Sequence, residues 1–275
     1  MTSLWIRLRS QALRLNENSQ RKSIVACVFA SDLHLSNEIP EKLVLFESFL
    51  NRASKSAEAL YLLGDVFEIW LGDDDDSEPH PRIIRALREF ADSGTRLFVM
   101  RGNRDFLFGP GFEQAVGATL LPDWYTLDLF GTPTLLAHGD LLCTKDVQYQ
   151  EFRKYVRDPT NQQSFLACSL DERREIAANT RSGTQASMLE KDEVIMDVEQ
   201  VTVEQIMRDY NVDQLIHGHT HRPESHSFKS ETGISRERHV LGDWYGVGSV
   251  LIGGSKGISR MSAGEFVDAP DSVFN

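Results

Sequence analysis

The chain has 275 residues, of which 41% are hydrophobic, and a formal net charge of -12 at pH 7. This length suits one large domain or one domain with an insertion. The acidic balance argues against a general attraction to nucleic acid, and no apolar run reaches the length of a membrane-spanning helix. Cys27, Cys143 and Cys168 lie far apart and form no CxxC pair, which argues against a disulfide framework and favours a reducing compartment.

The N-terminal extension, residues 1–23, is basic, in contrast to the rest of the chain. Its cations are Arg7, Arg9, Arg14, Arg21 and Lys22, against the single acid Glu17. Trp5, Leu8, Ala12 and Leu15 share one helical face, which is consistent with an amphipathic segment lying on a membrane surface. A frayed basic tail is the alternative interpretation. The segment lacks the continuous apolar region of a secretory signal, so we expect a cytoplasmic protein.

From residue 24 onward, apolar runs of strand length alternate with helical spacing. The run SIVACVFAS is followed by Leu43, Phe46 and Leu50 at helical intervals. The same succession recurs in ALYLLGD before PRIIRALREF and in RLFVMRGNRD before FGPGFEQAV, and TLLAHGD and QLIHGH are two further runs. The part from HVLGDWY through SVLIGG lacks helical spacing. The pattern predicts an α/β fold made of βα units with a strand-rich C-terminal part.

Seven side chains able to bind metal follow the ends of five predicted strands. They are Asp32 and His34 after the first strand, Asp65 after the second, Asn103 after the third, His138 after the fourth, and His219 and His221 after the fifth. Loops at the carboxyl ends of strands converge in α/β sheets. Nitrogen and oxygen donors without thiolate suit Mn, Fe, Zn or Co. One metal with open positions needs about three or four protein ligands, whereas two metals sharing a carboxylate need about seven, so we expect two ions.

The segment IHGHTHRP carries three histidines at alternate positions. In an extended segment, alternate side chains point the same way, so we expect His219 and His221 to face one cluster. His217 stands at the same alternate spacing but lies nearer the strand. Its position is equally consistent with supporting a ligand and with belonging to the core. A single DxH, GD or GN is more often a turn or a helix cap, so the prediction depends on all five strand ends together.

The strings DLH, GD, GNRD, HGD and GHTH, in this order, resemble the signature of the calcineurin-like dimetal phosphoesterases. The longer strings SDLHL, GDVFEIW, GDDDD, GNRDFL, LAHGD, IMDV and IHGHTHRP are similar to the UDP-2,3-diacylglucosamine pyrophosphohydrolases of lipid A biosynthesis within that superfamily. The resemblance implies a four-layer β-sandwich flanked by helices. It also implies a lipid-linked UDP-sugar as substrate, release of UMP and 2,3-diacylglucosamine 1-phosphate, two Mn2+ ions, peripheral contact with the cytoplasmic side of the inner membrane, and neither nucleic acid nor an obligate protein partner.

The resemblance also assigns roles to individual residues. It implies one metal held by Asp32, His34, Asp65 and His221, and a second held by Asp65, Asn103, His138 and His219, with Asp65 bridging. The implied catalytic residues are Asp65, Asn103, Arg104 and His138. The implied substrate contacts are Asn103, Arg104, Asp146, Thr184, Met188, Lys191 and His219. Two positions depart from the family pattern: Thr184 stands where serine is expected, and Met188 stands where a polar amide is expected and cannot make its hydrogen bond.

Arg104 bears on the kind of bond that is cleaved. Many relatives in the broader superfamily have a histidine after this asparagine, where it can protonate an alkoxide leaving group. Arginine stays charged and cannot do so. A phosphate leaving group, with a second pKa of about 6, needs little protonation, which favours pyrophosphate over monoester hydrolysis.

The spacing of the candidate ligands indicates an insertion. Asp32, Asp65, Asn103 and His138 follow one another at intervals of 33, 38 and 35 positions, but His219 comes 81 positions later. We therefore divide the core into residues 24–144 and 200–275, with a helical insertion at residues 145–199. Its apolar positions are Phe152, Tyr155, Val156, Phe165 and Leu166, and its cations are Arg153, Lys154, Arg157, Arg173, Arg174 and Arg181. An ordinary surface hairpin is one interpretation; the resemblance favours a lid over the metal site.

Further acidic residues lie in the run at residues 72–76 and beside the candidate ligands. Residues 72–76, GDDDD, lack the spaced donors of an EF-hand and are expected to form a solvated loop. Asp105 and Asp140 adjoin candidate ligands, and their positions are consistent both with orienting a ligand and with capping a turn.

Two alternative functions remain open. The chain could be another dimetal phosphoesterase, acting on nucleotides or phosphoproteins, or a non-catalytic scaffold, which predicts missing ligands.

Overall fold

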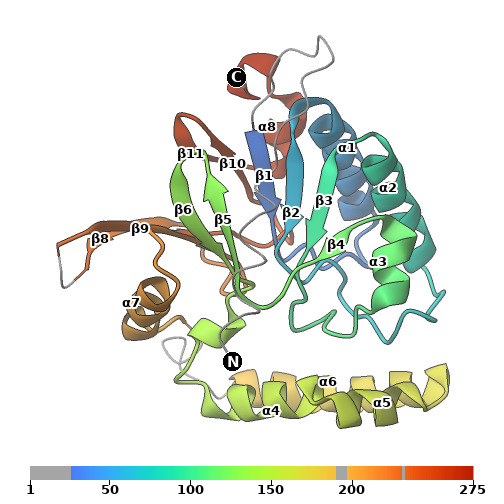
Figure 1. The fold of residues 1–275 in the computed structure, drawn as a ribbon. Helices are drawn as coiled ribbons and strands as arrows, with labels where there is room; N and C mark the ends of the chain where they lie inside the picture. Colours follow the sequence, from blue (N-terminus) through green and yellow to red (C-terminus); the bar gives the residue numbers. More distant parts are fainter. Residues whose placement is uncertain (1–25, 190–196, 231–232, 275) are drawn as a thin grey trace, which may run out of the picture.

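The computed structural model describes residues 26–189, 197–230 and 233–274, with side chains described up to residue 181 in the first range. Two mixed β-sheets face each other (Figure 1). The six-stranded sheet has the order β11-β10-β1-β2-β3-β4, made of Gly257–Met261, Val250–Gly254, Ala26–Ala30, Ala59–Leu62, Arg96–Val99 and Thr119–Leu120. The five-stranded sheet has the order β5-β6-β7-β9-β8, made of Tyr125–Leu129, Thr132–Leu136, Gln214–His217, Ser235–Val240 and Ser225–Lys229.

The central strand β1 is buried on both faces, which explains its continuous apolar run. Ala26, Val28 and Ala30 join a core beneath the helices, whereas Cys27 and Phe29 join a second core between the two sheets. Because successive side chains of a strand point to opposite faces, a strand covered on both sides needs no polar positions. β1 pairs in parallel with β2 and antiparallel with β10, so the C-terminal strands close one side of the sheet that the N-terminal βα units build.

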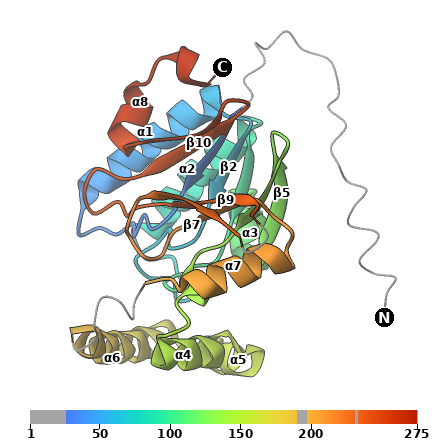
Figure 2. The ribbon, with the colours of Figure 1, turned by 90° about the vertical axis from the view of Figure 1, so that its left-hand side faces the viewer.

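Helices cover the outer face of each sheet. α1 (Pro40–Ser56), α2 (His80–Asp92), α3 (Pro110–Val116) and α8 (Ala263–Asp268) contribute to the core on the six-stranded sheet. α7 (Gln200–Asp209) packs Val203 and Met207 against Leu135 and Leu215 of the five-stranded sheet. Figures 1 and 2 show these outer helices on opposite sides of the paired sheets. The four-layer α/β fold expected from the sequence is confirmed.

The hairpin between β5 and β6 is an element that the sequence pattern did not reveal. Phe130 and Gly131, between the two strands, both have positive φ angles, of 54° and 90°. Such two-residue turns match the twist of the flanking strands and usually carry Asn-Gly or Asp-Gly. Phenylalanine in the first position hides this signal. The strands β8 and β9 form a further antiparallel pair.

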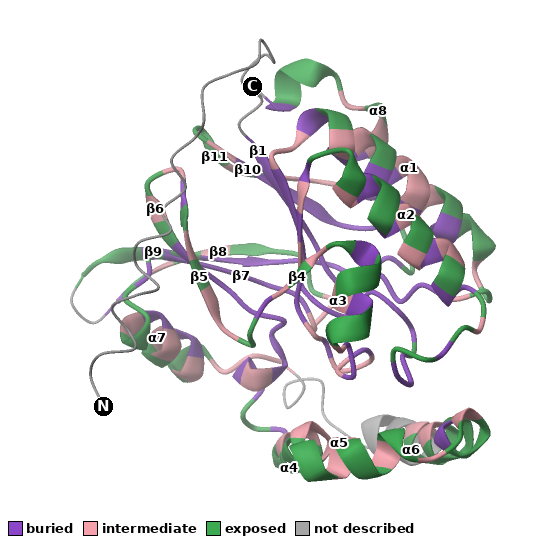
Figure 3. Ribbon diagram, turned by 45° about the vertical axis from the view of Figure 1, so that its right-hand side comes forward, coloured by how far each residue is buried: buried purple, intermediate pink, exposed green. Residues whose placement is uncertain are grey.

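The segment predicted as a helical insertion contains α4 (Val147–Arg157), α5 (Pro159–Leu166) and α6 (Leu170–Leu189), after a short 3-10 helix at Asp140–Leu142. The three helices lie together beside the ends of both sheets (Figure 2). Most of their surface is exposed or half-buried (Figure 3). Among the apolar positions of the insertion, Phe152, Tyr155 and Leu166 are exposed. Arg173 is the one buried side chain among the described ones of these helices.

The basic N-terminal extension lies outside the described residues, so its two interpretations stay open. Among the residues that the structure describes, no helix combines the length and apolar character that a membrane span requires.

Replacing Phe49, which is fully buried, tests the core beneath the helices. Its ring lies 5.4 Å from that of Trp244 and 4.9 Å from that of Phe266, measured between ring centroids. Phe49→Ala should lower the free energy of unfolding by about 3–5 kcal/mol, because it leaves a cavity among rings that cannot collapse. Val44→Ala, on the exposed side of the same helix, should change it by less than about 0.5 kcal/mol. Urea denaturation measures both, and equal losses would contradict this core.

Candidate metal centre

The seven candidate ligands lie on loops that follow β1, β2, β3, β6 and β7, and several of these loops have unusual backbone geometry. Seven non-glycine residues in the described chain have positive φ. Five of them are candidate ligands, namely Asp32, His34, Asp65, His219 and His221. Such conformations cost about 1–3 kcal/mol each and cluster at functional sites, because the surrounding structure must hold them in place.

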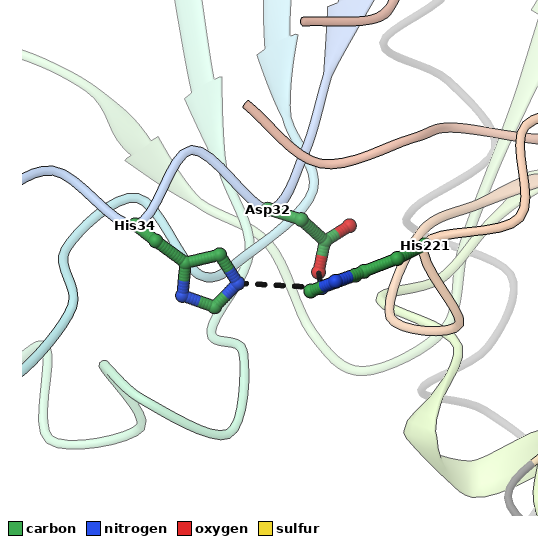
Figure 4. Close-up of side chains that lie close together, drawn as sticks. All are labelled: Asp32, His34 and His221. Atoms are coloured by element: carbon green, nitrogen blue, oxygen red, sulfur yellow. Dashed lines mark hydrogen bonds and ion pairs between the residues drawn. The ribbon is translucent and has the colours of Figure 1, made fainter. Parts of the chain in front are cut away.

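Asp32, His34 and His221 form the first set of candidate ligands (Figure 4). Nε2 of His34 lies 3.3 Å from Nε2 of His221, and Nε2 of His221 lies 3.3 Å from Oδ1 of Asp32. Asp32 and His34 are buried. Three donor atoms of a carboxylate and two imidazoles thus face one another from loops far apart in the sequence.

Asn103, His138 and His219 form the second set. Oδ1 of Asn103 lies 3.0 Å from Nε2 of His138 and 3.0 Å from Nδ1 of His219. The two imidazole rings meet edge to face, with centroids 5.1 Å apart. The loops after β3, β6 and β7 therefore bring an amide oxygen and two imidazoles together.

Asp65 lies between the two sets. Its Oδ2 is 3.8 Å from Nε2 of His34, and its Oδ1 is 3.9 Å from Nε2 of His138. The backbone N–H of Arg104 donates to Asp65 Oδ1 at 2.8 Å, and Gly102 packs against the same oxygen. One carboxylate thus offers an oxygen to each set, as expected of a group shared by two ions.

The donor atoms present fit divalent cations. Within the described part of the chain, the buried Asp32 Oδ1 faces Nε2 of His221 at 3.3 Å and has no further hydrogen-bond partner, which leaves it able to bind a cation. The imidazole nitrogens that face each other across the first set need a cation or proton between them. Asp65, Asn103, His138 and His219 complete a second group of oxygen and nitrogen donors without thiolate, which suits Mn, Fe, Zn or Co.

The distal ring nitrogens of three histidines face groups outside the two sets. Nδ1 of His138 donates to the carbonyl of Leu63 at 2.8 Å, which leaves Nε2 free to bind metal. Nδ1 of His34 lies 3.3 Å from Oε2 of Glu68. Nδ1 of His221 lies 3.3 Å from Oδ2 of Asp243. Glu68 and Asp243 were not among the residues predicted from the sequence. The only signals for them were the position of Glu68 just after a predicted strand and the GD dipeptide of LGDWY for Asp243, and both are weak.

The electrostatics of the cluster favour positive charge. Burial opposes protonation of His138, yet the carboxylates of Asp65 and Asp32 raise its pKa above the usual value. Burial also opposes ionisation of Asp32, but the hydrogen bond with His221 and nearby imidazoles lower the pKa of its carboxyl well below its usual range. Burial lowers the pKa of His219 to about 4, which leaves this imidazole neutral and able to coordinate at pH 7.

Asp105 supports the loop that carries Asp65. It is fully buried, and its Oδ1 accepts from the N–H of Gly102 at 2.7 Å and from that of Asp65 at 3.3 Å. Its Oδ2 accepts from the N–H of Val66 at 2.6 Å. Burial, followed by the charge of Asp65, raises the pKa of Asp105 to about 7. Of the two roles considered for Asp105, the structure favours orientation of a ligand loop.

Asp140, by contrast, attaches the helical insertion. Its Oδ2 accepts from the hydroxyl of Tyr149 at 2.9 Å and from Nε of Arg153 at 2.6 Å, both on α4. The ring of Tyr149 in turn lies 5.7 Å from that of His219. The acid next to His138 therefore links the fourth strand end to α4.

The IHGHTHRP segment differs from the expected extended conformation. His219 and His221 have φ angles of 68° and 56°, so they face different ligand sets through turns rather than through strand alternation. His217 is a core residue: its Nδ1 donates to the carbonyl of Gly218 at 2.9 Å, and its Nε2 accepts from Arg238 at 3.2 Å. Burial lowers the pKa of His217 to about 3, consistent with this neutral form.

The acidic segment Gly72–Asp76 was expected to be a solvated loop, but part of it forms ion pairs with the helical insertion. The two carboxylate oxygens of Asp74 each accept a hydrogen bond from the guanidinium of Arg173 on α6, and both N–O distances are 2.7 Å. Asp75 is buried and accepts from the hydroxyl of Ser77 at 2.7 Å, with Arg174 at 3.4 Å. Arginines of the helical insertion therefore neutralise part of this loop.

The predicted substrate contacts are described only in part. Arg104 lies beside Asp65, and its buried Nε has no hydrogen-bond partner among the described residues. Asp146 caps α4 by accepting from the N–H of Tyr149 at 3.0 Å. Lys191 lies outside the described residues, as do the side chains of Thr184 and Met188. Their predicted roles stay predictions.

The fold and the cluster together define a metal-dependent phosphoesterase. A model of the calcineurin-like phosphoesterase family matches residues 27–223, and the chain belongs to this family. The chain is 45% identical over 217 residues to a Hahella chejuensis protein named UDP-2,3-diacylglucosamine hydrolase, covering 79% of this chain and 88% of that protein. It is 46% identical over 231 residues to a protein of the same name from Xanthomonas axonopodis pv. citri, covering 82% and 93%.

Among solved structures, an archaeal phosphodiesterase aligns over 86% of this chain and 99% of its own, with a TM-score of 0.44 and 11% identity. Membership of the family implies divalent metal ions, and the chain is a metal-dependent hydrolase.

Gly102→Ala tests the position of Asp65, because a Cβ at residue 102 would overlap Asp65 Oδ1. We expect less bound metal per chain and a phosphoesterase rate lowered about 100-fold, since displacing a reacting group by about 1 Å has this effect. Gly264→Ala, where a Cβ meets nothing within 4 Å, is the matched control and should behave as wild type. Elemental analysis after gel filtration and a rate assay measure the two quantities. Wild-type metal content in Gly102→Ala would be evidence against the bridging position.

Proposed function

We propose that this chain hydrolyses the pyrophosphate bond of UDP-2,3-diacylglucosamine with two Mn2+ ions, and releases UMP and 2,3-diacylglucosamine 1-phosphate. The observation that carries the proposal is the complete set of seven donors, with one oxygen of Asp65 directed to each histidine set. The substrate is inferred from the name of relatives that are 43–46% identical over most of their length. A scaffold that had lost catalysis is expected to lack ligands, and here each of the seven is present.

We propose Asp32, His34, Asp65 and His221 as ligands of one ion, and Asp65, Asn103, His138 and His219 as ligands of the other. When bound, two divalent ions outweigh the negative charges of Asp32 and Asp65, lower the pKa of water, and so attract and activate the reacting groups. The fixed Nδ1 of His138 and the backbone N–H bonds to Asp65 and Asp105 hold these donors in place before substrate arrives.

Arg104 is proposed to neutralise the diphosphate. Its buried Nε has no partner among the described residues, which is consistent with a cation reserved for an anionic ligand. Because a guanidinium cannot release a proton at neutral pH, Arg104 stabilises charge but does not protonate the leaving group. A departing sugar phosphate needs no such proton, whereas an alkoxide does.

Residues 145–199 are proposed to form a lid on the centre. Nη2 of Arg157 donates to the carbonyl of Gly102 at 2.8 Å, and the Tyr149 ring lies 5.7 Å from that of His219, so α4 contacts two of the three loops that carry the second set. The exposed side chains of Phe152, Leu166 and Ile176 supply apolar surface for acyl chains. Asp146, Thr184, Met188 and Lys191 are proposed substrate contacts on this segment. An acylated substrate also suggests peripheral contact with the cytoplasmic side of the inner membrane.

Metal removal and product analysis test the proposed reaction. The chelated protein should be inactive on UDP-2,3-diacylglucosamine, and added Mn2+ should restore formation of UMP and the sugar 1-phosphate, detected by mass spectrometry. In 18O-labelled water we expect the label in UMP, because the resemblance to the UDP-2,3-diacylglucosamine pyrophosphohydrolases implies attack on the phosphorus nearer uridine. Asp65→Asn should remain at least about 100-fold slower even with saturating Mn2+. Absence of UMP, or wild-type rates in Asp65→Asn and His138→Ala, would refute the proposal.

The role of Arg104 predicts selectivity between phosphate esters. With Mn2+, we expect simple phosphomonoesters to react at least about 100-fold more slowly than the UDP-sugar lipid, since an alkoxide leaving group lacks a general acid here. Arg104→His places a titratable group at the position and should narrow this ratio. Comparable wild-type rates on both substrates would show that the leaving group does not decide the reaction.

A further inference from the structure

Glu68 touches both the first ligand set and the helical insertion. It follows β2 three residues after Asp65, and its side chain is buried. Its Oε2 lies 3.3 Å from Nδ1 of His34 and accepts from the hydroxyl of Tyr245 at 2.6 Å. Its Oε1 pairs with the guanidinium of Arg181 on α6. One carboxylate group therefore faces a candidate metal ligand with one oxygen and the insertion with the other.

The surroundings of His34 leave its ring little freedom. The ring of Tyr245 stacks on it, with centroids 5.2 Å apart and planes 20° apart. The buried ammonium of Lys42 donates to the carbonyl of His34 at 2.8 Å and lies 4.1 Å from the centroid of the Tyr245 ring. Because backbone and ring face are both held, the carboxylate of Glu68, 3.3 Å from Nδ1, is the group placed to fix the direction of Nε2.

We propose that Glu68 is a positioning residue that couples the docking of α6, through Arg181, to metal affinity at the set Asp32, His34 and His221. The inference deepens the proposed function and rests on it. When Arg181 pairs with Glu68, the carboxylate is held against His34 and Nε2 is presented to the metal. When α6 departs, the carboxylate loses one of its three partners and the imidazole loses its fixed orientation. By thermodynamic reciprocity, metal bound at His34 must stabilise the docked α6 to the same extent.

A second ion pair of the same helix provides the matched control. Arg173, two turns before Arg181, is bound to both oxygens of Asp74 and donates to the carbonyl of Leu71 at 2.9 Å. Neither Asp74 nor Leu71 is a candidate ligand. Asp74→Asn therefore weakens the attachment of α6 without touching His34, whereas Arg181→Met removes the attachment that passes through Glu68.

The experiment is Mn2+ titration of the metal-free full-length chain by calorimetry, with hydrogen exchange of α6 measured with and without Mn2+. Glu68→Gln should weaken one of the two sites about 10- to 100-fold, because it removes the charge that orients His34. Arg181→Met should weaken the same site about fivefold or more, Arg181→Lys should recover part of this loss, and Asp74→Asn should weaken it clearly less than Arg181→Met, because Arg181 still pairs with Glu68. Saturating Mn2+ should slow exchange in residues 170–181 of wild type, but much less in Glu68→Gln.

Equal Mn2+ affinity in wild type and Arg181→Met would overturn the coupling, and so would an equal loss in Asp74→Asn. Both results leave the proposed function intact, provided that wild type binds two equivalents. Fewer than two equivalents in wild type would instead refute the two-metal site and the coupling with it. Circular dichroism of each variant, compared with wild type, identifies any loss of affinity that comes from unfolding.

Discussion

The position of one buried carboxylate, that of Asp65, is the constraint on which the rest of the centre depends. Its two oxygens face different histidine sets, so any displacement changes both sets at once. The chain leaves room for it by having no Cβ at Gly102, and holds it by backbone N–H groups and by Asp105 beneath its loop. A carboxylate that serves two ions, as proposed for Asp65, cannot be placed by a flexible loop alone.

The four layers supply the rigidity that this constraint requires. Strands β1, β2 and β3 are parallel neighbours, and β6 and β7 are parallel neighbours in the facing sheet, so their loops open toward one edge. Five candidate ligands there have positive φ, a conformation that non-glycine residues rarely keep without tight support. The buried cores on both faces of the six-stranded sheet therefore hold strained loops in place as well as stabilising the fold.

The helical insertion is attached in a different manner from the layers. Arginines bind it to the core, through Arg153 with Asp140, Arg173 with Asp74 and Arg181 with Glu68. Its apolar side chains are largely left on the surface instead of being used for packing. Because ion pairs attach the insertion, its exposed apolar side chains stay accessible, as the proposed lid requires.

The sequence by itself determined the fold class and the seven candidate ligands, because both follow from local information. Hydrophobic periodicity identifies strands and helices, and any donor just after a parallel strand must lie at the carboxyl edge of a sheet. Only the tertiary structure decided which groups meet. The contact between Glu68 and Arg181 joins residues 113 positions apart, and that between His34 and His221 joins residues 187 positions apart.

The core role of His217, the separate sets of His219 and His221 and the hairpin at Phe130 also escaped the pattern. These features depend on backbone angles and on neighbours from other elements, which residue spacing does not encode.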